Sequence, residues 1–462
     1  MRIALALTLL SLLVPSPASA RETPPARDTG VLGIRSEQLD PGYWLARLPQ
    51  PDRVVLSREA IAAQNAKLYA ADPTMHDLSK LPELLSGVQV REWIEALRPS
   101  FDKPLFDERG QPLDPASLSA GVETGLNLVA VGKTVVPRFA LAVRRADLRA
   151  APDRRRVFRD PEDHDIDRWQ ESALFPGTPV AIVHESGDGQ WAFVVAPNYA
   201  AWVEKQYLAE GTRDAVLGYG RERPHIVVTG ANVRTTFTPE EPRASSLQLD
   251  MGLKLPLLDR PPREAVNGQD AYASYVVELP VRDADGKLQF APALVPRSAD
   301  VSGDYLPLTQ ANLLRQGFKF LGERYGWGHS YGTRDCSGFV SEIYRSFGVQ
   351  LPRNTSAQAV SPALNRIAVG KDDDRAKRLA LMQATQPGDL IYIPGHVMMV
   401  IGHEDGRTWI IHDTTGATWL DADGQRLHAD LNGVSVTPFE TMLAGGEATY
   451  ADRITNIQRI RP

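Results

Sequence analysis

The sequence contains only one cysteine, Cys336, among 462 residues. No intrachain disulfide can therefore form. A single thiol in a chain of this size is either an inert buried side chain or a reactive group, and the count alone does not separate the two.

An excess of positive charge is also absent. The chain has 51 Lys and Arg against 57 Asp and Glu, a net charge of -6, and no basic run stands out. A surface for binding nucleic acid is therefore not expected. Hydrophobic residues at 43% and charged residues at 23% are typical of soluble folded proteins, which excludes collagen-like and predominantly disordered chains.

Long hydrophobic runs are missing after the N-terminus, so no membrane span is expected in the mature protein. Residues 1–20 have the order of a secretory signal, namely Arg2, an apolar run from Ile3 to Val14, and Ala18-Ser19-Ala20. No cysteine follows to carry a lipid. We expect a soluble monomer that starts near Arg21 and is exported to the periplasm or secreted.

The length favours about three domains. Residues 28–130 are predicted to form a helical packing or clip domain. Ser57 is placed to cap one helix, and a second helix is expected over Val88 to Leu97, ended by Pro99.

From residue 133 the pattern changes to short apolar runs separated by Gly, Asp and Pro, which is typical of small β-barrels. Val180–Val183 and Trp191–Val195 predict a hairpin, and a second hairpin is expected to turn at Asp283–Gly286. Ala146-Asp-Leu-Arg149 resembles Ala231-Asn-Val-Arg234, 85 residues later. We therefore expect two barrels, residues 133–215 and 216–300, with chance similarity as the alternative.

The last part predicts an α+β domain, because helices precede strands. A helix is expected to begin at Cys336, capped by Asp335 and ended near Gly348. The other expected elements are a helix over Ala311 to Gly322 and strands over Leu390 to Ile393, His396 to Ile401 and Thr408 to His412.

Cys336 at a helix start meets the needs of a nucleophile. Backbone N–H groups and the helix dipole favour a thiolate there and supply donors for an oxyanion, so we expect a depressed thiol pKa. His396, held after Pro394-Gly395 at a strand end, is the expected base. His412 closes the next strand, and antiparallel pairing would bring it beside His396 to orient the ring.

The residues also suggest two other kinds of site, a metal site and a serine nucleophile. A metal site could draw on His396, His403, His329 and Asp413, but no HExxH is present and His396 and His403 fall on opposite faces of a strand, so no metal is expected. Gly328-His-Ser-Tyr-Gly332 matches the nucleophile elbow of serine hydrolases, with Ser330 as nucleophile. It lacks the preceding strand and immediate helix that the motif requires.

Five motifs together resemble the NlpC family of papain-like cell-wall peptidases in order and spacing over residues 306–462. They are Tyr325-Gly-Trp-Gly328, Asp335-Cys-Ser-Gly-Phe-Val340, Leu351-Pro-Arg353 with Gln358, Gln386-Pro-Gly-Asp-Leu390, and Gly395-His-Val-Met-Met-Val-Ile-Gly402. The upstream chain is similar to long family members, in which a helical clip domain and two bacterial SH3 barrels precede an α+β papain-like peptidase domain.

The resemblance implies an endopeptidase that cleaves the γ-D-glutamyl–diamino acid bond of peptidoglycan stem peptides, the muropeptides, without a cofactor. It implies Cys336 as nucleophile, His396 as base and His412 as the orienting residue. The substrate contacts expected with it are Tyr325 near the oxyanion and Asp335, Ser337, Arg353, Asn354 and Thr355 in the pocket.

Two departures from the family pattern stand out. His329 occupies the place of a second glycine, and Arg353-Asn354-Thr355 that of Arg-Asp-Ser. Without a carboxylate at Asn354, we expect weaker discrimination in favour of a free L-Ala amine. Asp167 and Trp169, in the polar loop of the first barrel, are further expected substrate contacts.

The alternative functions are an acyltransferase or amidase on the same fold, and a wall-binding protein with an inactive peptidase domain. The serine hydrolase is the least favoured.

Overall fold

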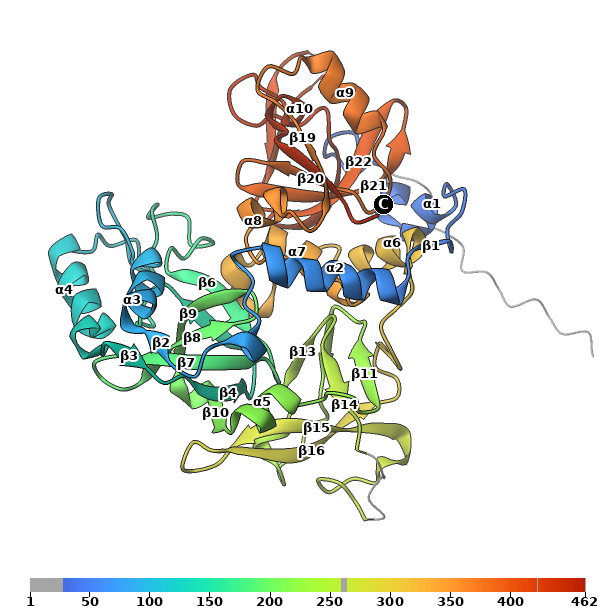
Figure 1. Ribbon diagram of the computed structural model, residues 1–462. Helices are drawn as coiled ribbons and strands as arrows, with labels where there is room; N and C mark the ends of the chain where they lie inside the picture. The colour runs from blue at the N-terminus through green and yellow to red at the C-terminus, as the bar shows by residue number, and fades with distance from the viewer. Residues whose placement is uncertain (1–27, 259–263, 422, 462) are drawn as a thin grey trace, which may run out of the picture.

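The computed structural model describes residues 28–258, 264–421 and 423–461. The predicted signal segment, residues 1–20, lies outside the described residues. In Figure 1 the C-terminal region is uppermost, two β-rich regions lie below it, and helices α3 and α4 flank the first of these. Within the described part of the chain, no helix is both long and apolar enough to cross a membrane.

The C-terminal region is a six-stranded sheet in the order β19-β26-β20-β21-β22-β25, with its helices packed around it. The helix predicted at Cys336 is α7, and the three predicted strands are β20, β21 and β22, paired antiparallel. Its elements are β18 Leu308–Thr309, α6 Gln310–Phe318, α7 Cys336–Arg345, α8 Thr355–Val360, β19 Asn365–Ala368, α9 Arg375–Gln383, β20 Leu390–Ile393, β21 His396–Glu404, β22 Arg407–Thr414, β23 Ala417–Leu420, β24 Arg426–Ala429, β25 Gly433–Pro438, α10 Tyr450–Arg453 and β26 Asn456–Arg459.

The first β region is a seven-stranded sheet in the order β10-β4-β7-β8-β9-β5-β6. The predicted hairpin is formed by β7 and β8, whose apolar side chains are buried. The elements are β4 Arg138–Ala142, β5 Ala146–Arg149, β6 Gln170–Leu174, β7 Pro179–Glu185, β8 Trp191–Ala196, β9 Tyr199–Glu204, β10 Leu208–Gly211 and α5 Arg213–Gly218.

The second β region is divided into three small sheets rather than one. The predicted hairpin joins β15 and β16, and its turn is closed by the Asp283 N–H donating to the Lys287 carbonyl at 3.0 Å. β17 pairs with β11 beyond the expected boundary at residue 300. The elements are β11 His225–Val228, β12 Asn232–Arg234, β13 Gln248–Asp250, β14 Lys254–Pro256, β15 Ser274–Arg282, β16 Leu288–Pro296 and β17 Val301–Ser302.

The N-terminal segment contains the two predicted helices, α2 and α3, and two that the sequence did not predict, α1 and α4. Ser57 caps α2 by accepting the Ala60 N–H at 3.2 Å. The elements are α1 Pro41–Leu45, β1 Val54–Leu56, α2 Arg58–Ala71, β2 Leu85–Ser86, α3 Gly87–Ala96, α4 Pro115–Leu126 and β3 Thr134–Val135.

The buried side chains of this segment are divided among three hydrophobic clusters, the smallest of which joins Leu68 and Met75 to Ala363. Trp44 and Ile61 belong to the cluster of the C-terminal region, whereas Val90, Ile94 and Leu118 pack with the first β region. Short helices with one apolar stripe must bury it against another layer. The packing thus differs from that of one helical unit with its own core.

Helix α2 lies along the C-terminal region in Figure 1 and is bonded to the end of α7. Arg58 donates to the Phe347 carbonyl at 3.0 Å, and Asn65 donates to the Gly348 carbonyl at 2.8 Å. After α2 the chain turns to the first β region, where the His76 N–H donates to the Pro197 carbonyl at 2.8 Å. The segment therefore connects the two regions directly.

Candidate active site

Cys336 is the first residue of α7, as the sequence predicts. The Asp335 carboxylate caps the helix by accepting the Gly338 N–H at 2.8 Å. Sγ lies 3.7 Å from Thr355 Oγ1, and the residue is 6% exposed. The N–H groups of Cys336 and Ser337, in the first turn of the helix, are therefore left without intrahelical partners beside the almost fully buried sulfur.

The two histidines form a chain that ends on a residue the sequence reading missed. His396 Nε2 and His412 Nδ1 are 2.8 Å apart, and His412 Nε2 lies 3.0 Å from Thr437 Oγ1. With Nε2–H donating from each ring, His396 Nδ1 keeps its lone pair and can accept a proton. Thr437 lies on β25, a strand for which the sequence offered no motif.

The protonation states differ from the expected activated thiol. Burial raises the pKa of the Cys336 thiol to about 12, and the Asp335 carboxylate acts in the same direction. Burial lowers the pKa of His396 to about 4. The expected depressed thiol pKa is therefore wrong, because burial and the capping carboxylate both disfavour the thiolate. Burial thus favours the neutral form of both the thiol and the His396 imidazole.

Tyr325 is buried beside this pair. Burial, followed by the nearby Cys336 and Asp335, holds the pKa of its phenol well above the usual range. The hydroxyl therefore remains protonated and can donate a hydrogen bond to a negative charge that develops at the thiol.

Arg353 is an internal support rather than a substrate contact. Nε donates to Ser172 Oγ at 2.7 Å, Nη1 to Asp335 Oδ1 at 3.2 Å and Ser337 Oγ at 2.8 Å, and Nη2 to Asp335 Oδ2 at 2.7 Å and His329 Nδ1 at 3.1 Å. A guanidinium has five N–H donors, and all five are used here. This corrects the expectation that Arg353 contacts substrate.

Asp335 and Ser337 belong to the same internal network. Burial alone would raise the pKa of Asp335, but the Arg353 guanidinium holds it well below the usual range. The carboxylate also accepts the Gly328 N–H at 3.0 Å, and Ser337 donates to it at 3.0 Å. Both side chains are buried, so they form the floor of the site.

The sequence around this geometry matches known families. Residues 322–443 match the NlpC/P60 family, and residues 156–204 match an SH3 domain of the SH3b1 type. The C-terminal region belongs to the NlpC/P60 family. A γ-D-glutamyl-L-lysine dipeptidyl-peptidase of Bacillus cereus is 25% identical over 289 residues, which are 59% of this chain and 71% of that protein.

Two further similarities agree with this assignment. A probable endopeptidase p60 of Listeria welshimeri is 32% identical over 97 residues, but these are only 20% of this chain and 16% of that protein. The solved structure of an NlpC/P60 endopeptidase from Photobacterium damselae subsp. piscicida has a TM-score of 0.71 at 15% identity, covering 89% of this chain and 94% of that one. At that identity the likeness concerns the fold alone.

The first β region places a carboxylate, Glu171, beside the NlpC/P60 domain, and the sequence analysis did not single out this residue. Glu171, on β6, is half-buried and accepts a hydrogen bond from the Tyr199 hydroxyl, which is also bonded to the exposed Asn354. Burial raises the pKa of Glu171, whereas Tyr199 and Arg353 oppose the rise. Asn354 is thus linked through Tyr199 to a carboxylate of the first β region, whereas Thr355 lies beside Cys336.

The loop before β6 does not have the expected role. Trp169 is 1% exposed and packs in the core of the first β region. Asp167 is paired with Arg149 and accepts the backbone N–H groups of Val157 and Trp169. Neither side chain can wall off substrate, because both stabilise the loop from within.

The loop does reach the NlpC/P60 domain through Asp165, which pairs with Arg324 and accepts from Asn432 Nδ2 at 2.7 Å.

The serine alternative fails on geometry. Ser330 lies in a kinked turn, residues 327–332, without a preceding strand, and no described histidine is hydrogen-bonded to its hydroxyl. Among the described residues, no group of three or more His, Cys, Asp or Glu could hold a metal ion.

Proposed function

We propose that the protein is a cysteine endopeptidase that hydrolyses the γ-D-glutamyl–diamino acid bond of peptidoglycan stem peptides. The observation that carries the proposal is the thiol at the start of α7, which interacts with the backbone N–H of Val397, the residue next to His396 of the His396–His412–Thr437 chain. The Bacillus cereus relative, named for a γ-D-glutamyl-L-lysine bond, supports this substrate class.

The neutral resting pair leads to a mechanism in which the thiol loses its proton as substrate binds. His396 Nδ1 accepts the proton while sulfur attacks the γ-carbonyl carbon. The oxyanion is stabilised by the Cys336 backbone N–H and the Tyr325 hydroxyl. His396 then protonates the departing amine, which leaves a thioester. A water molecule, deprotonated by His396, releases the γ-carboxylic acid and regenerates the thiol.

The acyl half of the substrate would bind between the NlpC/P60 domain and the first β region. A free L-Ala amine is a cation. Asn354 has no negative charge to pair with it, but Glu171, linked to Asn354 through Tyr199, is a half-buried carboxylate. We therefore revise the expectation drawn from Asn354 alone. Glu171, held by Tyr199, would pair with the ammonium and favour stem peptides with a free amine.

We also propose the domain boundaries of the chain. They are a helical clip over residues 28–130, SH3-like barrels over residues 133–215 and 216–300, and the peptidase domain over residues 306–462. The order of Arg2, the apolar run and Ala18-Ser19-Ala20 supports export to the periplasm or beyond. A monomer suffices, because the residues of the site come from one chain.

The test is digestion of defined muropeptides followed by mass spectrometry. Cleavage between D-Glu and the diamino acid by wild type, and none by Cys336→Ala, supports the proposal. Transfer of the acyl group to an added amine in preference to water would indicate the acyltransferase. Sacculus binding without any cleavage would indicate the wall-binding protein.

A further inference from the structure

His329 lies where the NlpC/P60 domain meets both β regions. Its backbone has φ 66°, a conformation that is costly for a residue with a side chain. The ring is edge-on to Phe175 of the first β region, with centroids 5.5 Å apart. On its other side it covers the first turn of α7, where a Cβ on Gly338 would come within 2.7 Å of Cε1. The ring thus fills the junction closely.

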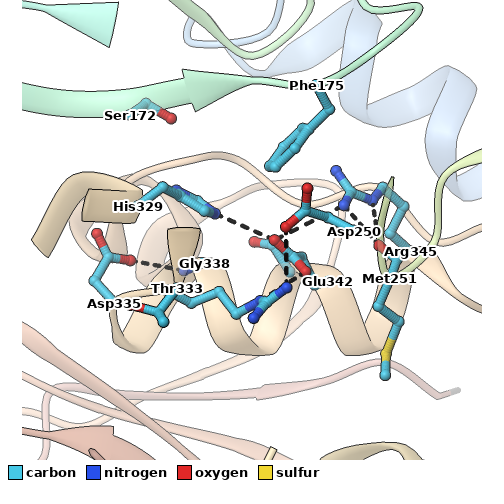
Figure 2. A network of polar contacts seen from close by, with 12 residues as sticks. Ser172, Phe175, Asp250, Met251, His329, Thr333, Asp335, Gly338, Glu342 and Arg345 are labelled. Carbon is cyan, nitrogen blue, oxygen red and sulfur yellow. Dashed lines mark hydrogen bonds and ion pairs between the residues drawn. The ribbon is translucent and has the colours of Figure 1, made fainter. Parts of the chain in front are cut away.

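The hydrogen bonds of the ring allow one neutral tautomer. Arg353 Nη2 lies 3.1 Å from His329 Nδ1, and because a guanidinium only donates, Nδ1 must carry a lone pair. The proton is therefore on Nε2, which lies 3.3 Å from Glu342 Oε1. Neither Nε2 nor that oxygen has a hydrogen-bond partner among the described residues, so the two atoms face each other as a close buried pair. Figure 2 shows the ring directed toward Glu342, with Phe175 and Ser172 above it.

The charges around the ring are balanced only while it is neutral. Four arginines and four carboxylates face this junction, namely Arg145, Arg334, Arg345, Arg353, Asp250, Glu323, Asp335 and Glu342. Burial, and then Arg353 and Arg145, hold the pKa of His329 well below its usual value. A protonated ring would turn an N–H group toward the Arg353 guanidinium and break their hydrogen bond.

Both β regions reach the same cluster. Arg145 of the first β region donates to the His329 carbonyl at 2.9 Å, and Ser172 accepts from Arg353 at 2.7 Å. Asp250 of the second β region accepts from Arg334 at 3.0 Å. The position of Arg353, and with it the Asp335 cap of the cysteine helix, therefore depends on how the β regions dock.

We propose that His329, as the neutral Nε2–H tautomer, is a positioning residue that fixes Arg353 and thereby aligns the cysteine helix and the Asn354-Thr355 segment that follows Arg353. The proposal rests on the proposed function for its catalytic consequence. The structural part, the hydrogen bond from Arg353 to Nδ1, stands without it.

The kinetic test compares His329→Gly with His329→Asn, since both residues tolerate a positive φ. Asn offers a carbonyl acceptor near the place of Nδ1, whereas Gly offers none. We expect His329→Gly to lower kcat on muropeptides about 10- to 100-fold with a small change in KM, and His329→Asn to recover most of the loss. Equal losses in both variants, or full activity of His329→Gly, would overturn the proposal.

Nuclear magnetic resonance tests the hydrogen bond without relying on activity. In ¹⁵N-histidine spectra, the signal missing from His329→Asn identifies His329 among the nine histidines. We expect an Nε2-protonated ring between pH 5 and 8, and slowly exchanging Arg353 guanidinium protons that become fast in His329→Gly. A ring protonated on Nδ1 contradicts the assignment. If wild type cleaves no muropeptide while this tautomer is found, the proposed function fails and the link to Arg353 stands.

Discussion

At the scale of single residues, the thiol, the two histidines and Thr437 have different roles, so their substitutions should lower kcat by different factors. Cys336→Ala removes the bond-forming atom and is expected to abolish hydrolysis. His396→Ala removes the base and should cost about 10²- to 10⁴-fold in kcat. His412→Ala and Thr437→Val only disturb the orientation of His396, so losses of about 10- to 100-fold are expected.

Muropeptide hydrolysis followed by chromatography measures these rates, and Thr418→Val, at a threonine whose hydroxyl contacts the exposed His428, is the matched control. Wild-type turnover by Cys336→Ala would contradict the thiol mechanism.

The neutral thiol predicts an unusual alkylation profile. With a thiol pKa of about 12 and a His396 pKa of about 4, the thiolate is scarce at neutral pH. We expect the rate of iodoacetamide reaction to rise with pH beyond the midpoint of a free thiol, about 8.5, without a plateau near neutrality. Protein unfolded in urea is the control and should show the ordinary midpoint. A plateau below pH 7 would instead reveal a thiolate–imidazolium pair.

Recognition of the substrate amine gives a further prediction. Glu171→Gln keeps the size and the hydrogen bond with Tyr199 but removes the charge, so the preference for free-amine over N-acylated peptide should fall about tenfold or more, since each 1.4 kcal/mol is a factor of ten. Asn354→Asp should change it less, because one carboxylate is already present. The ratio of kcat/KM for a tripeptide to that for its N-acetyl form measures this preference in each variant. An unchanged ratio in Glu171→Gln would show that the amine is bound elsewhere.

At the scale of elements, the largest buried side chain that the N-terminal segment packs on the C-terminal sheet is Trp44. Trp44 is 1% exposed, packs against Trp409 and lies so close to β21 that a Cβ on Gly402 would come within 2.8 Å of it.

Trp44→Ala should therefore destabilise the fold by about 3–5 kcal/mol through the cavity it leaves. Urea unfolding monitored by circular dichroism measures the loss. Tyr272→Ala, at an aromatic residue that is 85% exposed, is the control and should be nearly neutral. A small effect of Trp44→Ala would mean that α1 contributes little to stability.

At the scale of the whole molecule, buried neutral histidines predict sensitivity to acid. Burial lowers the folded-state pKa values of His329, His396 and His412 below the unfolded value of 6.5. The unfolded chain therefore binds more protons below that pH, so stability is fully present above about pH 6.5 and is lost as pH falls toward 4.

The free energy of unfolding should decline over this range, and His329→Asn should decline less steeply. His428→Asn, at an exposed histidine, should leave the slope unchanged. Equal slopes in wild type and His329→Asn would contradict the assignment of a neutral buried ring.

Much of the NlpC/P60 domain was readable from local sequence. The helix at Cys336 and the strands at Leu390, His396 and Thr408 were predicted because capping residues and period-two apolar runs are short-range signals. The pairing of His396 with His412 followed from antiparallel neighbours in the chain. Both hairpins were likewise set by turn residues between apolar strands.

What the sequence by itself determined is thus the order of elements, the place of Cys336 at a helix start with His396 and His412 on neighbouring strands, and the family that this order resembles. Only the tertiary structure decided that all five donors of Arg353 are used, that Asp167 and Trp169 are internal, that Thr437 bonds His412, that His329 accepts from Arg353 and that Glu171 is paired with Tyr199. The physical reason is that these roles depend on burial and on contacts between segments far apart in the chain, such as Arg353 with Ser172. Local patterns carry no information about desolvation, which also reversed the expected pKa of the Cys336 thiol.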